Sequence, residues 1–193
     1  MRKAALFGIG FVAVTTAALA SMVRFTGPKA DTRAAVRPPP PAAVIALKMA
    51  IPVEGVAVAK LIDTWGQSRG GGARAHQGID IMAPRGRPVR AYADGVVEKL
   101  FHSRDGGITL YHRSADRAWT YYYAHLDRYA PGIVEGTRIK AGQTLGFVGD
   151  SGNAGAGNTH LHFAINRMKR DEPWHGGEAV NPYPLLVGSG RAR

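Results

Sequence analysis

From Val44 onward, the chain alternates short apolar runs with clusters of glycine, proline, asparagine and aspartate. Short runs rich in β-branched and aromatic residues, bounded by turn residues, are typical of β-strands. The pattern predicts a strand, a turn and a strand within 89–97, strands at 108–112, 119–125 and 160–166, short β segments within 136–149, and a closing loop at 181–184. After residue 43 no run keeps a helical period over several turns, so the sequence predicts a mainly β, compact antiparallel domain.

The first 23 residues have the features of an export segment. Arg2 and Lys3 give a positive N-terminus, and residues 4–23 carry no charge and predict an apolar helix. The Ala-Leu-Ala sequence that ends at Ala20 has the pattern of a signal-peptidase site, yet the apolar stretch is also long enough to span a bilayer. We therefore expect either a cleaved signal peptide or an anchor in the cytoplasmic membrane. Both place the rest of the chain outside the cytoplasm, in the periplasm or cell envelope.

A linker is expected at 24–43, where proline, alanine and basic residues leave few apolar groups to bury. Its four consecutive prolines, 38–41, favour an extended and semi-rigid polyproline segment. The expected organisation is thus the export segment, this linker, one domain at 44–187 and a basic tail at 188–193. A domain of that length can bury a hydrophobic core.

The net charge of +11 belongs mainly to the ends of the chain. Residues 44–187 have 17 Lys and Arg against 13 Asp and Glu, a net charge of +4, while residues 1–43 carry +5 and the last six carry +2. We expect no nucleic-acid partner, because such a partner would call for a basic face on the folded domain. The chain has no cysteine, so any metal would bind through His, Asp or Glu.

Four of the seven histidines fall into three short clusters. The first contains His76 and Asp80, the second contains His125, and the third contains His160 and His162. Two imidazoles and one carboxylate at tight spacing are typical of a zinc site that leaves a fourth position open to water, as catalytic sites do. The clusters therefore indicate hydrolysis by an activated water.

Strand geometry predicts how these side chains are presented. Residues i and i+2 of a strand project from the same face, so His160 and His162 point the same way and Leu161 points to the opposite layer. One histidine of this pair can hold a metal while the other stands beside it as an acid–base group. His76 and Asp80 also share a face, but four extended residues span about 13 Å. We therefore expect the chain to curve between them, with Gly78 permitting the bend.

In order along the chain, the clusters resemble the motifs of the lysostaphin/LytM-type zinc metalloendopeptidases. The motifs are His-x-Gly-x-Asp at 76–80, Tyr-x-His-Leu at 123–126 and His-x-His-Phe at 160–163. Shorter matches, among them Trp65-Gly66 and Asn181-Pro182, extend the resemblance over residues 60–187. It implies a small LytM-type β domain with a groove across a central antiparallel sheet. Many relatives carry an acidic residue where this chain has Ala164, at a position that is not a ligand in the family.

The resemblance also implies roles for the clustered residues. His76, Asp80 and His162 are the expected ligands of one Zn²⁺ ion, and His125 and His160 are the expected catalytic histidines. The implied activity is that of an endopeptidase acting on the peptide cross-links of peptidoglycan. Links between D-alanine and diaminopimelate and glycine bridges are both within the range of the family. The sequence leaves open which bond is cut, whether a protein activator is needed and whether residues 24–60 inhibit the enzyme.

Other interpretations of the chain have weaker support. Gly149-Asp-Ser-Gly152 imitates a serine-protease nucleophile motif, but without the matching scaffold it is better interpreted as a loop. A non-catalytic relative that binds and activates wall hydrolases is the main alternative, although such proteins typically lack zinc ligands that this chain retains. Residues 134–143 resemble a lipoyl-type hairpin without its modified lysine. Core or surface positions are expected for His102, His112 and His175, and Tyr121–Tyr123 are expected to pack in the core, with groove lining as the second possibility.

Overall fold

The computed structural model describes residues 51–188. The expected export segment, the linker and all but the first residue of the basic tail lie outside the described residues. Within 51–188 the chain forms a nine-stranded sheet and a separate two-stranded one, with every pairing antiparallel. The predicted mainly β fold is confirmed. No helix in this range has the length and apolarity needed to cross a membrane.

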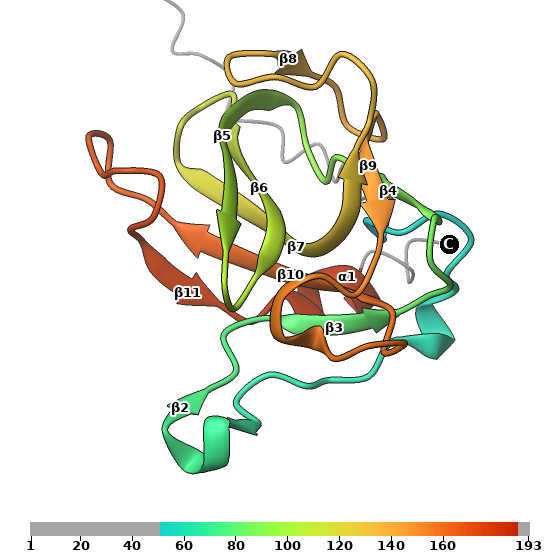
Figure 1. Ribbon diagram of the computed structural model, residues 1–193. Coiled ribbons are helices and arrows are strands. Elements are labelled where there is room, and N and C mark those ends of the chain that lie inside the picture. The colour runs from blue at the N-terminus through green and yellow to red at the C-terminus, as the bar shows by residue number, and fades with distance from the viewer. Residues whose placement is uncertain (1–50, 189–193) are drawn as a thin grey trace, which may run out of the picture. The chain divides into compact units, whose positions relative to one another are not determined.

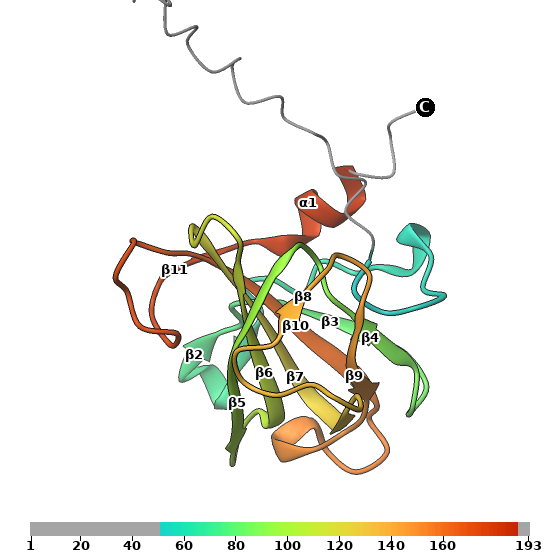
Figure 2. The same ribbon diagram turned by 90° about the horizontal axis from the view of Figure 1, so that it is seen from above.

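The large sheet is built around four long strands (Figure 1). They are β5 (Gly95–Ser103), β6 (Gly107–Ser114), β7 (Trp119–Tyr129) and β10 (His160–Arg167). β7 lies between β6 and β10, and the sheet continues outward to β8 (Arg138–Ile139) beyond β5 and to β11 (Glu178–Val180) beyond β10. Figure 2 shows β5, β6 and β7 side by side from a second direction.

Three further strands complete the sheet around these four. β3 (Ile79–Met82) pairs with the first half of β10, on the edge that β7 does not occupy. β9 (Thr144–Val148) pairs with the end of β7 and with β4 (Pro88–Arg90). The two-stranded sheet is a hairpin of β1 (Ser68–Arg69) and β2 (Arg74–Ala75), joined by a 3₁₀ turn at Gly70–Gly72.

The alternation of side chains along β7 explains both the core and the groove. Tyr121 and Tyr123 are buried in the hydrophobic core, whereas Tyr122 and Ala124 face a groove on the other side. On β10, Leu161 and Phe163 are fully buried in the same core. Burial of such side chains supplies about 1.5–3 kcal/mol each. One layer of aromatic and aliphatic residues therefore supports the strands that line the groove.

The predicted closing loop at 181–184 is wrong, because the helix α1 (Pro182–Gly188) begins there. Oδ1 of Asn181 accepts a hydrogen bond from the Tyr183 N–H at 2.9 Å, as a helix N-cap does, and Pro182 occupies the first helical position. Leu186 is fully buried and secures the helix against the core. With only seven residues, α1 is too short to show a helical period in the sequence.

Candidate metal centre

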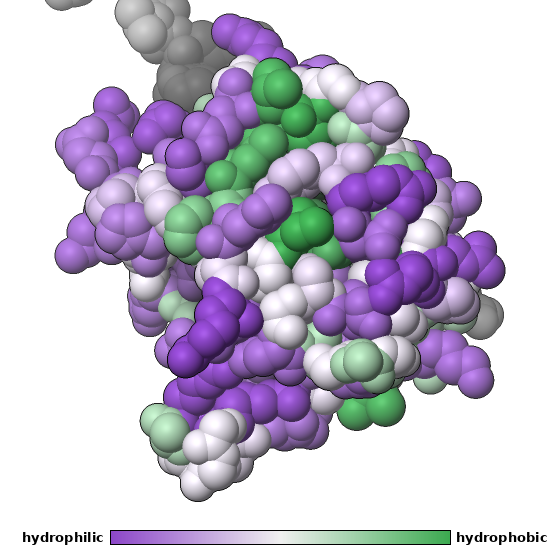
Figure 3. All heavy atoms as spheres, in the orientation of Figure 1, coloured by the Kyte–Doolittle hydropathy of each residue, from purple (hydrophilic) through white to green (hydrophobic). Residues whose placement is uncertain are grey.

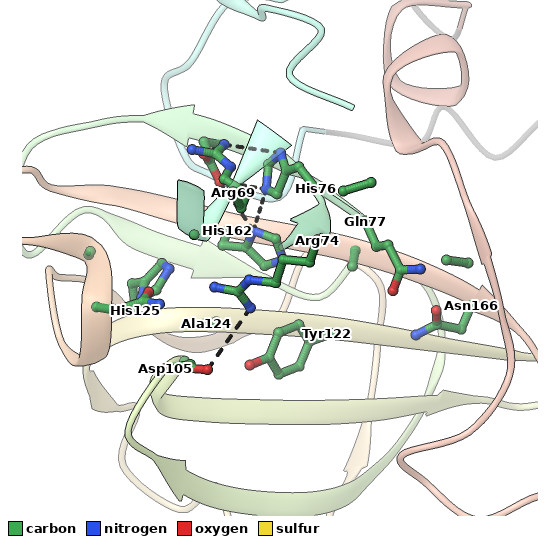
Figure 4. Close-up of a pocket in the computed structure, with 18 of the residues that line it drawn as sticks. Arg69, Arg74, His76, Gln77, Asp105, Tyr122, Ala124, His125, His162 and Asn166 are labelled. Carbon is green, nitrogen blue, oxygen red and sulfur yellow. Dashed lines mark hydrogen bonds and ion pairs between the residues drawn. The ribbon is translucent and has the colours of Figure 1, made fainter. Parts of the chain in front are cut away.

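The metal donors come from two strands that pair directly. Asp80 on β3 and His162 on β10 are partners in the antiparallel register, and His76 lies just before β3. His162 Nδ1 is 2.8 Å from His76 Nε2 and 3.1 Å from Asp80 Oδ1, and the last two atoms are 3.2 Å apart. A tetrahedral zinc ion with bonds of about 2.0–2.1 Å separates its ligand atoms by about 3.3 Å. The three donors therefore converge at close to the spacing that one ion requires. Figure 4 shows two of them, His76 and His162, next to each other.

Gly78, just before β3, lies directly against β10. The chain around it brings His76 Nε2 within 3.2 Å of Asp80 Oδ1, although Gly78 is not among the glycines with positive φ. A Cβ at this position would lie 2.7 Å from the Phe163 carbonyl oxygen and 2.8 Å from His162 Cε1. Glycine is required because the His162 ring occupies the space of a side chain.

The loop before β1 fixes the orientation of two donors. His76 Nδ1 donates to the Thr64 carbonyl oxygen at 2.7 Å, which leaves Nε2 as the unprotonated nitrogen facing the site. The Thr64 hydroxyl accepts the backbone N–H of Asp80 at 3.0 Å. Arg69 Nη2 donates to Asp80 Oδ2 at 2.5 Å, so Oδ1 is the oxygen left for a metal. In both side chains, therefore, a partner holds the atom that faces away from the site, so that His76 Nε2 and Asp80 Oδ1 face the site.

The charges of the donors follow from these contacts. Burial raises the pKa of Asp80, but hydrogen bonds with His162 and His76 outweigh it and hold that pKa well below its ordinary value. Burial lowers the pKa of His162, against the opposing effect of Asp80. An ionised carboxylate and neutral imidazoles are the forms that bind a metal ion.

Two further histidines face the same groove with a free ring nitrogen. His160 Nδ1 donates to the Asn158 carbonyl oxygen and His125 Nδ1 to the Ser151 carbonyl oxygen, both at 2.8 Å. The two ring centroids are 4.8 Å apart, and His160 Nε2 is 3.8 Å from Asp80 Oδ1. Burial lowers the pKa of His125 to about 4, despite the opposing hydrogen bond to Ser151. The Nε2 atom of His125 is therefore an acceptor at neutral pH.

His125 reaches the groove only because β7 contains a bulge. By strict alternation it would point into the core with Tyr123, but its φ of 60° places it in the left-handed region and shifts the register against β6. The next residue, Leu126, is then fully buried. Bulges of this kind re-aim side chains beside active sites. One feature of the sequence indicates the bulge. Two core residues, Tyr123 and Leu126, are an odd number of positions apart, whereas a regular strand places residues of one face an even number apart.

The groove around these residues has a volume of about 660 Å³. Its walls include Tyr122 of β7, His175 of the β10–β11 loop, and Arg74 and Asp105 on opposite sides. Groove lining was the second possibility for Tyr122, after packing, whereas His175 was expected to be a core or surface residue and its place in the groove was missed. Their contribution depends on long-range contacts, such as Trp174 packing on Tyr111, which no local motif encodes.

The structure places all five residues of the predicted clusters around one groove, and places His102, His112 and Ser151 outside its lining. His112 is buried in the core of the sheet, and His102 stacks near Tyr129 with ring centroids 6.1 Å apart. The hydroxyl of Ser151 donates to the Leu126 carbonyl oxygen at 2.7 Å and accepts the N–H of Ile108 at 2.9 Å. Ser151 is thus held by backbone partners on both sides, in keeping with the loop interpretation.

A mainly antiparallel β domain whose groove carries two imidazoles and a carboxylate at ligand spacing is the architecture of a metallopeptidase. Comparison with known families gives the assignment. The chain belongs to peptidase family M23, whose model matches residues 74–182. The predicted resemblance to the lysostaphin/LytM-type enzymes is therefore confirmed.

Three relatives show the range of proteins that this chain is similar to. The L-Ala--D-Glu endopeptidase of Bacillus subtilis (strain 168) is 38% identical over 64% of this chain and 38% of its own length. The murein hydrolase activator NlpD of Escherichia coli (strain K12) is 33% identical over 70% of this chain and 30% of its own length. The catalytic domain of the antimicrobial peptidase lysostaphin from Staphylococcus simulans is 25% identical, with a TM-score of 0.54 over 67% of this chain and 94% of that domain. The chain thus spans less than half the length of either curated relative.

Proposed function

We propose that this protein is a zinc-dependent endopeptidase that hydrolyses peptide cross-links of peptidoglycan. The observation that carries the proposal is the convergence of His76, Asp80 and His162 within 4.8 Å of one another, next to two histidines that present free Nε2 atoms to the same groove. The similarity to an L-Ala--D-Glu endopeptidase supports a peptide of the cell wall as the substrate.

The donor set fits a zinc ion in both chemistry and spacing. Two imidazoles and one carboxylate with an open fourth position are the ligand set of catalytic zinc sites. When bound, zinc supplies a lowered pKa for a coordinated water and polarises a carbonyl group. In this chain Arg69 and Thr64 hold the donors in place, and these two residues lie outside the expected ligand set.

His125 and His160 are the residues that we expect to move protons. Each has its Nδ1 proton committed to a backbone carbonyl, so Nε2 is the atom that meets the substrate or a water molecule. One of them would accept a proton from the attacking water, and the other would stabilise the developing oxyanion or return a proton to the leaving amine. The bulge at His125 and the hydrogen bond of His160 fix both rings before substrate binds.

A second candidate function is that of a non-catalytic activator of wall hydrolases, which the similarity to NlpD favours. An activator needs no metal, and nothing in such a role would preserve three converging donors together with two oriented histidines. The endopeptidase is therefore the better-supported candidate, and bound zinc is the property that separates the two.

We also propose that the protein acts outside the cytoplasm. Arg2, Lys3 and the uncharged residues 4–23 support export, and peptidoglycan is the matching substrate in the cell envelope. Whether the export segment is cleaved after Ala20 or retained as an anchor would be read from the mass of the protein recovered from envelope fractions.

The test uses purified zinc-loaded protein and peptidoglycan of known chemistry, with the released fragments identified by mass. We expect His162→Ala to lose bound zinc and hydrolysis together. His125→Ala is expected to retain about one zinc ion while hydrolysis falls by about 10²-fold or more. Full hydrolysis by either variant would refute these roles. A zinc-free or inactive wild-type protein that stimulates a separate wall hydrolase would support the activator instead.

A further inference from the structure

Arg74 is a cationic side chain of the groove that the proposed chemistry does not use. It lies on β2, two residues before His76, and lines the groove together with the metal donors. Figure 4 shows its side chain extending across the groove toward Asp105 on the opposite wall. The side chain is 55% exposed, so a ligand in the groove can reach it.

The contacts of Arg74 leave most of its guanidinium available. Its Nη1 is 4.0 Å from Asp105 Oδ2, beyond hydrogen-bond distance, and an exposed ion pair at that separation contributes little. With its amide oxygen turned toward Arg74, Asn153 accepts one hydrogen bond from Nη2 at 3.2 Å. A guanidinium has five N–H donors, and a carboxylate can take two of them in parallel.

Arg69, the other arginine of the groove, shows the contrast. Its Nη2 already donates to Asp80 Oδ2 at 2.5 Å, so its charge is committed to a metal donor. Arg74 has no such close carboxylate partner among the described residues. The groove thus contains two arginines with different roles. Arg69 positions the metal donor Asp80, and the guanidinium of Arg74 is available to a substrate.

We propose that Arg74 binds a free carboxylate on the substrate residue that supplies the scissile nitrogen, which deepens the proposed function and rests on it. A glutamate or diaminopimelate residue in a wall peptide keeps a carboxylate near that nitrogen, whereas a glycine bridge has none. The substrate class is therefore an acidic stem peptide rather than a neutral glycine bridge.

The experiment compares two synthetic peptides that differ only in one group, a free carboxylate or its primary amide, on the residue that supplies the scissile nitrogen. For the zinc-loaded wild type we expect kcat/KM to be about tenfold or more higher for the acid than for the amide, since a hydrogen bond to a charged group is lost with the amide. Arg74→Gln should bring the ratio close to one, mainly by lowering kcat/KM for the acid. Added salt should also lower the ratio for the wild type.

Arg104→Gln is the matched control. Arg104 approaches the same Asp105 at 3.4 Å, but its side chain is 95% exposed and lies outside the groove lining. This variant removes one positive charge and should leave the acid-to-amide ratio at the wild-type value. A similar loss of discrimination in Arg104→Gln would mean that general charge, not Arg74, selects the substrate, and would overturn the inference.

Further outcomes separate this inference from the proposed function. Equal cleavage of both peptides by the wild type overturns the inference and leaves the endopeptidase in place. Faster cleavage of both peptides by Arg74→Gln also overturns it, because Arg74 would then cover the groove. If zinc-loaded protein cleaves neither peptide, the proposed function fails. Calorimetric binding of the acid and the amide to His125→Ala then still tests recognition by Arg74, with equal affinities contradicting it.

Discussion

The floor and the rim of the groove are built in different ways. We call the floor the strands β3, β7 and β10 together with residues 76–78 just before β3, which carry the metal donors and the two oriented histidines. The rim is the β1–β2 hairpin together with the β10–β11 loop. On the floor, His76, His125 and His160 are each at most 7% exposed, and each ring is held by a backbone carbonyl. On the rim, strands of two residues meet at a glycine turn, and the face around the hairpin is largely hydrophilic (Figure 3).

In the enzyme that we propose, the residues for the chemistry thus lie on the floor, and the residue for substrate recognition, Arg74, lies on the rim. The floor is fixed by strand pairing and by a shared core, so a change there alters the positions of the metal donors. The rim has few buried contacts, so a side chain such as Arg74 can be replaced with little effect on the fold. Binding residues are commonly placed on such connecting segments over a rigid scaffold.

The largest expected difference between floor and rim comes from replacing one glycine in each by alanine. In Gly78→Ala, the added Cβ would lie 2.7 Å from the Phe163 carbonyl oxygen and press on the His162 ring. We expect a loss of about 3 kcal/mol in the free energy of unfolding and about tenfold weaker zinc binding. In Gly71→Ala, the Cβ meets nothing within 4 Å, although φ is +69°.

The rim variant should therefore lose only about 1 kcal/mol, the cost of a left-handed alanine, and bind zinc normally. Denaturant unfolding and competition with a metal chelator measure the two quantities. Wild-type zinc affinity in Gly78→Ala would show that the floor is not rigid.

The pH dependence of stability tests β6, the strand that pairs with β7 of the floor. His112 is fully buried, and burial lowers its pKa from 6.5 to about 4, against the opposing effect of Asp94. Between these two values the unfolded chain binds more protons than the folded one. The free energy of unfolding should therefore fall as the pH drops through this window, by roughly 2–3 kcal/mol at pH 4.5.

His125 and His162 also have lowered pKa values, so the comparison is with His112→Gln, which removes one titrating group. Both proteins are unfolded with denaturant at pH 7 and pH 4.5 in the presence of a chelator. We expect the variant to lose less stability on acidification than the wild type. The same loss in both would mean that His112 is protonated in the folded protein.

The smallest expected effect is at Thr64, which connects the loop before the hairpin to the floor. Thr64→Val removes the acceptor of the Asp80 N–H, and leaving this group without a partner should lower the free energy of unfolding by about 1 kcal/mol. Thr64→Ser keeps the hydroxyl and should behave like the wild type in unfolding and in zinc binding. Wild-type stability in Thr64→Val would show that the hydrogen bond between the hydroxyl and the Asp80 N–H does not contribute.

The sequence predicted the strands and the five clustered residues because both depend on short-range patterns. Alternation along β10 places His160 and His162 on one face, and the structure agrees. The bulge at His125 was not predicted, since it depends on how β7 pairs with β6. The close approach of β10 to Gly78 was not predicted, because the atoms that exclude a side chain belong to Phe163 and His162, far away in the sequence. Arg74 and His175 reach the groove through the rim, whose position no local motif encodes.

The pairing of β3 with β10 joins residues that are 86 positions apart, His76 and His162. A nascent or misfolded chain in which these strands have not met presents only two neighbouring donors and no third. All three donors can therefore bind a metal ion only after the fold is complete, because His162 joins the other two when β10 pairs with β3. Metal that binds only the finished fold then stabilises it by mass action, by about 4 kcal/mol at a thousandfold excess over the Kd. The endopeptidase that we propose would in this way remain inert until its fold is complete.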